Sequence, residues 1–266
     1  MSTVVSSLTY ASASSLKDVV MPKEHGSWSL AFEPIALGLL IAPSGGGGWL
    51  ALALSAGFFA RRPLRLSAHE RQASRRAVAV TALMICALIA LLSMTAAVWM
   101  GGTAWLGWLA PVAIAAAVFA HFDRKGAGRE EAAEIAGSAA FALVPGAIAI
   151  LGGLTSWQAL AVALLSLSRS VPSVLCVRSF LRAKKTGVRH NRLALVASIL
   201  AVVTAEVLWA QRLIPFFGFA FMVMLALRAF ALLLIFRPPL RARTLGMTEA
   251  LLGVLFVAGV AIAWHA

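Results

Sequence analysis

Basic residues alternate with hydrophobic segments along this chain, and this alternation constrains its fold more than any other feature. Of the 23 Lys and Arg residues, 20 fall in every second gap between the hydrophobic segments. The other three are Arg212, in one of the remaining gaps, and Arg169 and Arg228, inside hydrophobic segments. Because cytoplasmic loops of membrane proteins are enriched in Lys and Arg, the pattern indicates a polytopic membrane protein and gives its orientation.

The hydrophobic segments predict an all-α membrane bundle of about nine transmembrane helices. Most are long enough to cross a hydrocarbon core, which needs roughly 20 apolar residues. The first two are short, and the glycine run 45–48 between them is expected to be a turn outside the membrane. We place the helices at 28–42, 49–60, 77–99, 104–120, 132–151, 157–177, 193–210, 214–236 and 249–264. The charge pattern puts the N-terminus in the cytoplasm, and an odd number of spans puts the C-terminus outside.

Two regions are expected along the chain. Residues 1–20 are rich in Ser, Ala, Val and Thr and lack a basic stretch followed by an apolar core. They are therefore interpreted as a disordered cytoplasmic N-terminus and not as a cleaved signal peptide. Residues 21–266 are expected to form a single transmembrane helical domain.

Composition excludes several classes of function. A net charge of +13 would suggest nucleic acid as the partner of a soluble protein, but topology already explains these charges. We expect the lipid bilayer and its anionic headgroups as partners, and no nucleic acid. The sequence has no Walker, HExxH or GxSxG motif and no Cys/His metal spacing. Asp occurs only at Asp18 and Asp123, so no metal site is expected, and no cofactor is indicated.

Six ionisable residues lie within hydrophobic segments, where each costs about 2.5–3.5 kcal/mol on insertion scales. They are Glu33, Glu134, Arg169, Glu206, Arg228 and Glu249. Counted from the outer helix ends at 1.5 Å per residue, Arg169 and Arg228 lie about 18 and 21 Å deep, in the cytoplasmic half. All but Glu206 fall in that half. Two interpretations are open: a polar cavity with the arginines as its floor, or Glu–Arg pairs that neutralise each other between helices.

Two segments carry further polar side chains. The first is 21–28, where Glu24 and His25, with Glu33 two turns later, are candidates for proton transfer; the alternative is a plain helix start. The second is 168–182, where guanidiniums and hydroxyls could bind a phosphate or carboxylate; the alternative is a kinked helix with snorkelling arginines. The candidate catalytic residues are His25, Glu24 and Glu33. The candidate ligand-binding residues are Lys23, Arg61, Arg62, Arg65, Arg169, Ser170, Arg178, Arg182 and Arg228.

The run Pro-Lys-Glu-His-Gly-Ser-Trp at 22–28, which enters a first helix with an early Pro34, resembles the YwiC-like family of bacterial integral membrane proteins. The stretch from Ser170 to Arg182 also resembles this family. The resemblance extends from about residue 21 to the C-terminus. It implies a multi-pass protein of the bacterial cytoplasmic (inner) membrane and implies no particular activity.

In helix count and orientation the chain is more distantly similar to the UbiA-like intramembrane prenyltransferases. The active site of that superfamily lies on cytoplasmic loops 2–3 and 6–7, which correspond here to the two most basic gaps, 61–76 and 178–192. The superfamily binds magnesium diphosphate there through aspartate-rich motifs, and neither gap of this chain contains Asp. This departure argues against magnesium-dependent prenyl transfer by the usual route. Direct contact with a lipid phosphate is a hypothesis for Arg61, Arg62, Arg65, Arg178 and Arg182.

Together these observations predict a cytoplasm-facing cationic pocket that binds or acts on an isoprenoid or lipid phosphate. A small-solute or ion transporter is one alternative, with Glu33, His25 and Arg228 on its path and Glu206 as the feature that fits it better. A non-catalytic membrane subunit is the other. The sequence leaves open the ligand, whether the chain is an enzyme, and the oligomeric state, because small residues are too abundant to identify a dimer face.

Overall fold

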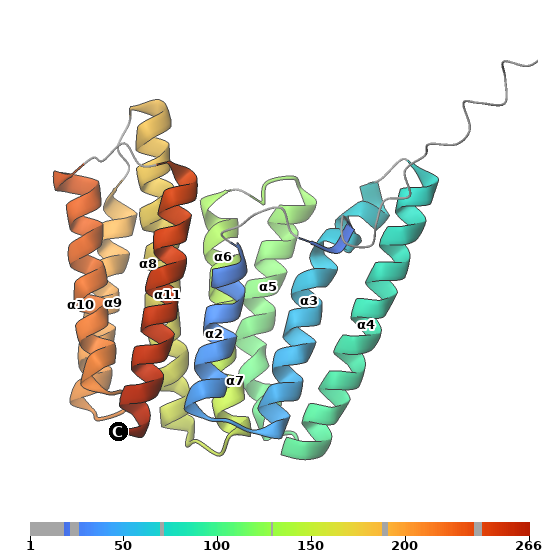
Figure 1. The fold of residues 1–266 in the computed structure, drawn as a ribbon, viewed down its shortest axis with the longest axis horizontal. Coiled ribbons are helices and arrows are strands. Elements are labelled where there is room, and N and C mark those ends of the chain that lie inside the picture. Colours follow the sequence, from blue (N-terminus) through green and yellow to red (C-terminus); the bar gives the residue numbers. More distant parts are fainter. Residues whose placement is uncertain (1–18, 22–26, 70–71, 129, 188–190, 237–240) are drawn as a thin grey trace, which may run out of the picture. The chain divides into compact units, whose positions relative to one another are not determined.

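The computed structural model describes residues 19–21, 27–69, 72–128, 130–187, 191–236 and 241–266. Within these ranges every regular element is a helix (Figure 1), which confirms the predicted all-α class. The elements are α2 (Ser27–Ile41), α3 (Gly45–His69), α4 (Ala73–Gly101), η1 (Ala104–Trp108), α5 (Leu109–Arg124), α6 (Glu131–Ala142), α7 (Val144–Leu151), α8 (Ser156–Thr186), α9 (Arg192–Ala210), α10 (Phe216–Phe230), η2 (Ala231–Ile235) and α11 (Ala242–His265).

In the described part of the chain these elements correspond to the nine predicted helices, because η1 continues into α5, α6 into α7 and α10 into η2. Seven of the resulting segments are long and apolar enough to cross a membrane: 73–101, 104–124, 131–151, 156–186, 192–210, 216–235 and 242–265. The apolar part of α2, Trp28–Ile41, is shorter. The chain is therefore a multi-pass membrane protein.

Two predicted boundaries at α3 were wrong. The glycine run 45–48 is the first turn of the helix and not a loop, and the Ser44 hydroxyl accepts a hydrogen bond from the Gly47 N–H at 3.0 Å, as a capping side chain does. The helix then continues past the apolar stretch to His69, so Arg61, Arg62 and Arg65 lie on a helix and not in a loop. Hydropathy marks where a helix leaves the lipid, and the backbone hydrogen bonds of the helix do not end there.

The helix α8 also extends beyond its predicted end. It begins with a capping box in which the Thr155 hydroxyl accepts from the Gln158 N–H. It ends at Thr186 and is followed by Gly187, whose φ of 72° lies in the left-handed region that favours glycine. Pro172, inside the helix, has no N–H to donate to the carbonyl of Ser168. Arg169 thus follows directly after Ser168, whose carbonyl lacks the usual helical N–H donor four residues later.

The chain forms two compact units, each described by itself. The smaller unit comprises 1–23 and 52–95. In it, Val19 is buried against Ala79 and Ala82, and the Arg62 guanidinium donates to the Met21 carbonyl. Residues 1–18 lie outside the described part, so the disordered N-terminus stays a prediction. The single domain over 21–266 also stays a prediction.

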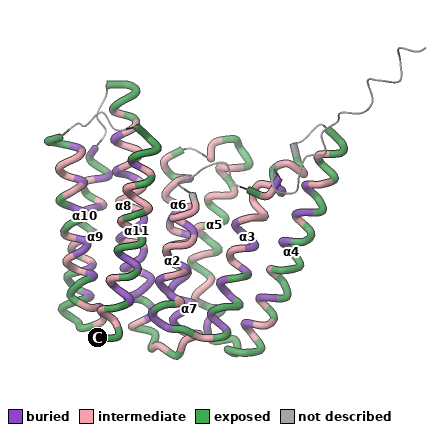
Figure 2. The backbone as a smooth tube through the Cα atoms, viewed as in Figure 1, coloured by how far each residue is buried: buried purple, intermediate pink, exposed green. Residues whose placement is uncertain are grey.

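The larger unit comprises 24–51 and 96–266, and α8 is its central helix, with α6, α7 and α9 packed around it. The helix α2 packs against α11, α6 and α7. Figure 2 shows buried positions on the inward faces of α8 and α11 and exposed positions on the outward faces of α9 and α10. One buried cluster includes Leu37, Leu165 and Phe256, and a second includes Leu175 and Leu245.

Charge is distributed unevenly between the two ends of the larger unit. The C-terminal ends of α5 and α8 and the start of α11 lie at one end, and the short connections before α8 and α10 lie at the other with the C-terminus (Figure 1). The first end carries basic residues such as Lys125, Lys184 and Arg241, whereas the second carries Arg212. This arrangement agrees with the predicted orientation, which stays a prediction.

The orientation predicts which engineered cysteines react from outside the cell. In a variant whose Cys86 and Cys176 are replaced by Ala, a cysteine at the exposed Gln211 should react with a membrane-impermeant maleimide in intact cells, because the positive-inside rule places it outside. A cysteine at the exposed Thr186 should react only after the cells are permeabilised. Labelling of Thr186→Cys in intact cells would contradict the orientation.

Candidate functional site

Four of the six charged residues predicted within the membrane meet in the larger unit. They come from four helices: Glu33 from α2, Arg169 from α8, Arg228 from α10 and Glu249 from α11. We call this set the charge cluster. Its formal charges sum to zero. Glu33 and Glu249 pair with Arg169, and Glu249 also pairs with Arg228, so the cluster contains the Glu–Arg pairs between helices that the sequence left open as an alternative to a polar cavity. The cluster itself is not cationic.

Arg169 is the centre of the charge cluster, and its side chain is only 4% exposed. Its Nη1 donates to the Ser173 hydroxyl at 2.5 Å, and its Nη2 donates to the backbone carbonyl of Glu249 at 3.0 Å. The carboxylates of Glu33 and Glu249 each lie 3.6 Å from one of its terminal nitrogens. Nε has no hydrogen-bond partner within the described residues, which leaves one buried donor of a permanent cation unsatisfied.

Glu249 connects the two arginines of the cluster. Its Oε1 accepts a hydrogen bond from Arg228 Nη1 at 2.5 Å, a charge-assisted contact of the strong class. Its Oε2 faces Arg169 at 3.6 Å and accepts no hydrogen bond within the described part of the chain. Arg228 Nη2 also lies 3.4 Å from the Thr248 hydroxyl, which donates to the carbonyl of Leu245. Glu249 is thus fixed by both guanidiniums.

Glu33 occupies a position that a glycine makes available. A Cβ atom built on Gly253 in α11 would lie 1.8 Å from Glu33 Oε1 and 1.9 Å from its carboxyl carbon. Real Cβ atoms never approach that closely, so the carboxylate lies directly on the backbone of α11. Gly253 follows Glu249 by one helical turn, which brings both carboxylates to the same stretch of α11.

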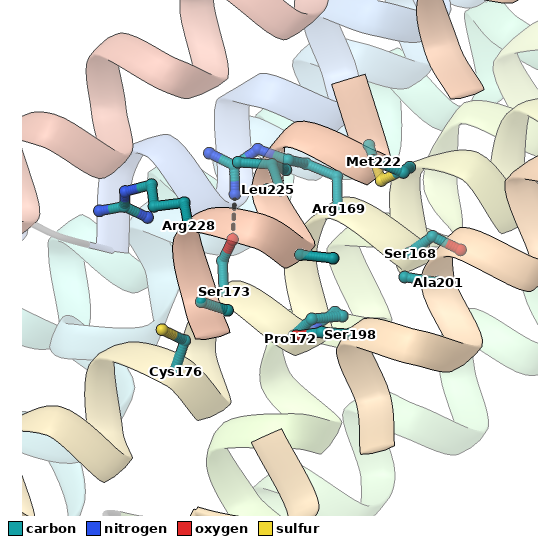
Figure 3. Close-up of a pocket in the computed structure, with 12 residues that line it drawn as sticks. Ser168, Arg169, Pro172, Ser173, Cys176, Ser198, Ala201, Met222, Leu225 and Arg228 are labelled. Carbon is teal, nitrogen blue, oxygen red and sulfur yellow. Dashed lines mark hydrogen bonds between the residues drawn. The ribbon is translucent and has the colours of Figure 1, made fainter. Parts of the chain in front are cut away.

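A small hollow adjoins the charge cluster between α8, α9 and α10. Figure 3 shows Ser173 directed at Arg169, with Arg228 close by. The polar lining consists of Ser168, Arg169, Ser173, Ser198 and Arg228. Its cavity volume is about 20 Å³, which accommodates water-sized groups only.

A second ion-pair group lies further along α8. Arg178 Nη1 donates to Glu134 Oε2 at 2.6 Å, and its Nε lies 3.5 Å from Glu131 Oε2. Both carboxylates lie in the first turn of α6, where the helix dipole favours negative charge. These groups are partly exposed, with 23% of the Arg178 side chain accessible. Arg178 therefore binds different carboxylates from Arg169.

The remaining candidate residues are dispersed. Ser170 is buried and Arg182 is exposed on α8. Arg61, Arg62 and Arg65 belong to the smaller unit. Lys23, Glu24 and His25 lie outside the described residues. Glu206 lies on the exposed surface of α9 and not in the charge cluster.

Sequence reasoning missed several contacts of the cluster. Ser173, four residues after Arg169, was detectable as a helical neighbour on the same face. Gly253 and Thr248 carried no such signal, because one α11 glycine among several and one threonine beside Glu249 identify no partner by themselves. No group of three or more His, Cys, Asp or Glu suited to a metal ion occurs in the part of the chain that the structure describes.

The two ion-pair groups should differ strongly in their contribution to stability. Arg169→Met leaves the buried Glu33 without its cation and removes one of the two guanidiniums that face Glu249, so it should lower the free energy of unfolding by about 3–5 kcal/mol. Arg178→Met removes a partly exposed pair and should cost no more than about 1 kcal/mol. Denaturant titration in detergent micelles measures both, with Arg212→Met as a control away from either group. Equal losses for Arg169 and Arg178 would contradict the assigned burial.

The contact between Glu33 and Gly253 gives a second stability prediction. Gly253→Ala places a methyl group on the Glu33 carboxylate and should destabilise the protein by about 1–3 kcal/mol. Gly246→Ala on the same helix meets no atom within 4 Å and should be neutral or stabilising by up to about 1 kcal/mol. Thermal melting in detergent compares the two. In a Glu33→Ala background, Gly253→Ala should cost less than it does in the parent, because the carboxylate that the methyl group meets is gone; absence of any such coupling would refute the contact.

Comparison with known proteins gives a match to a family model. Residues 21–149 match the family model described as YwiC-like protein, which covers α2 to α6 and most of α7. No curated protein and no solved structure matches the chain. The matched segment contains Glu33, while Arg169, Arg228 and Glu249 follow it. The chain is therefore similar to the YwiC-like family over residues 21–149.

Proposed function

We propose that this protein is a multi-pass protein of the bacterial inner membrane that binds an amphipathic anionic ligand, an isoprenoid phosphate or lipid phosphate, from the cytoplasmic side. The observation that carries the proposal is the pair Arg169 and Arg228, two guanidiniums from different helices that share the carboxylate of Glu249. Arginine keeps its charge at every physiological pH. This place in the membrane therefore always holds two positive charges, whose natural partners are carboxylates and phosphates.

Hydroxyl groups around the arginines support an oxyanion as the ligand. Ser168 and Ser173 line the hollow beside Arg169, and their hydroxyls can donate hydrogen bonds to phosphate oxygens. The Ser198 hydroxyl also lines the hollow but donates to the Ala194 carbonyl. The hollow itself is too small for a phosphate group. Binding therefore requires a carboxylate to move away from the guanidiniums.

Basic residues further along α8 support access from the cytoplasmic side. Between the charge cluster and the end of α8 at Thr186, the helix carries four further basic residues: Arg178, the exposed Arg182, Lys184 and Lys185. Each basic residue near a membrane surface attracts anionic headgroups by about 1 kcal/mol. Arg61, Arg62 and Arg65 present the same kind of surface on α3 of the smaller unit. The basic residues of α8 would concentrate an anionic lipid near the cluster.

Transport of a small solute or ion is the second candidate, and two interrupted spans favour it. The span 131–151 breaks at Leu143, just before Pro145, and α10 ends in the π-helical turn η2, three residues after Arg228. Interrupted helices near charged groups are typical of transporter binding sites. The exposed position of Glu206 on α9 does not favour a path through it.

Native mass spectrometry of the purified protein tests the proposal. We expect added farnesyl phosphate to bind the parent and to bind the charge-balanced variant Arg169→Gln/Glu33→Gln about 10–100-fold more weakly, because hydrogen bonds to a charged donor contribute about 1.5–3 kcal/mol. Arg212→Gln serves as the control and should bind as the parent does. Equal binding to all three proteins would refute the proposal. Uptake of a solute into proteoliposomes without such binding would favour transport.

A further inference from the structure

The two carboxylates of the charge cluster are held to different degrees. Glu249 accepts a hydrogen bond at 2.5 Å from Arg228, and its backbone carbonyl accepts one from Arg169. Glu33 lies 3.6 Å from Arg169 Nη2, beyond hydrogen-bond distance, and has a side-chain hydrogen bond with Ser29 on its own helix. Glu33 is therefore the carboxylate that leaves Arg169 at the lower cost.

The position of Glu33 depends on packing and not on a strong polar contact. Its carboxylate lies on the α11 backbone because Gly253 has no side chain there. A carboxylate placed by the absence of a methyl group, and not by hydrogen bonds from the guanidinium, can be replaced by another oxyanion without breaking a hydrogen bond to Arg169. The space left by the absent side chain of Gly253 therefore accommodates an anionic group next to Arg169.

Arg169 has donors ready for such an exchange. Its Nε–H is buried and has no partner within the described residues, and Nη2, the nitrogen that faces Glu33, lies on the same edge of the guanidinium. An edge with two parallel N–H groups binds two oxygens of one carboxylate or phosphate. The present partners use this edge incompletely, since Glu33 remains at 3.6 Å.

We infer that Glu33 is an exchangeable internal anion: an oxyanionic headgroup replaces it on Arg169, and Glu33 takes up a proton from water as it leaves. This inference rests on the proposed function and adds its coupling to protons. The four charges of the cluster sum to zero, so a monoanionic headgroup would leave one uncompensated negative charge in the membrane. Forming the O–H bond on Glu33 restores neutrality. Binding of one anion is thus linked to uptake of one proton.

The charged surroundings of Glu33 agree with this coupling. Of the helices packed against α2, α8 presents Arg169 and α11 presents Glu249, which is bound by Arg228 of α10. The acidic residues of α6, Glu131 and Glu134, are paired with Arg178, and α7 has no titratable side chain. Glu249 repels a negative Glu33, and a headgroup on Arg169 would remove its compensating cation. Both effects favour the protonated form of Glu33 once a headgroup is bound to Arg169.

Calorimetry on the full-length protein in phosphatidylcholine nanodiscs tests the inference. The probe is farnesyl methyl phosphate, a phosphodiester that keeps one negative charge between pH 6 and pH 8, unlike a monoester that titrates near pH 6. Titrations in two buffers of different ionisation enthalpy give the protons taken up per ligand. Dimethyl phosphate, the same headgroup without the tail, distinguishes a lipid ligand from a free oxyanion. Glu206→Gln, a carboxylate in a span outside the cluster, is the matched control.

We expect the parent to take up one proton per ligand, with Kd rising by up to about tenfold per pH unit. Glu33→Gln, which mimics the protonated acid, should bind at pH 8 at least as tightly as the parent at pH 6 and take up no proton. Parent-like binding by Glu33→Gln together with no proton uptake by the parent would overturn the inference and leave the proposed function intact. Absence of binding to parent and variant alike would overturn both. Should Glu33→Gln fail to fold, proton uptake by the parent alone decides.

Discussion

The cost of an unpaired charge in the bilayer determines how the larger unit is assembled. Each charged side chain at the centre of a helix costs about 2.5–3.5 kcal/mol on insertion scales, and the charge cluster draws one such residue from each of α2, α8, α10 and α11. None of these helices compensates its own charge. Their charges are balanced only when the four helices meet, so the ion pairs at Arg169 and Glu249 favour one mutual arrangement of the helices. The buried contacts among Leu37, Leu165 and Phe256 of the same helices are apolar.

Compensation also changes what the arginines can do. An uncompensated pair of guanidiniums would bind any anion strongly, whereas Arg169 and Arg228 already share Glu249 and face Glu33. A ligand must therefore compete with a carboxylate that belongs to the protein. Such competition restricts binding to ligands that bring more than charge, such as a phosphate with three acceptor oxygens or a lipid tail that partitions into the membrane. Specificity then follows from the difference between ligand and carboxylate, and not from the total charge.

The sequence predicted the helices and the depth of the charges better than it predicted their partners. Charge alternation and hydropathy identified nine helices and placed Arg169, Arg228 and Glu249 at similar depth, because both depend on the bilayer, which acts on every segment alike. The pairing of Arg169 with Glu33 depends on which helices are neighbours, and that information is absent from a single sequence. The end of α3 was mistaken because arginines that leave the hydrocarbon do not end a helix. Gly253 was missed because its role consists of an absent atom.

The family match and the charge cluster divide the chain in complementary ways. Residues 21–149 match the YwiC-like family model and contribute Glu33, while the two arginines and Glu249 come from the part of the chain that follows. Within the charge cluster, neither part is electrically neutral without the other: the first contributes one carboxylate, and the second contributes two guanidiniums and one carboxylate. Packing α2 between α11 and α7 supplies the missing negative charge. With Glu33 as the exchangeable carboxylate, the ligand binds where these two parts of the chain meet. Its headgroup then supplies the negative charge that Glu33 of the first part provides to Arg169 of the second.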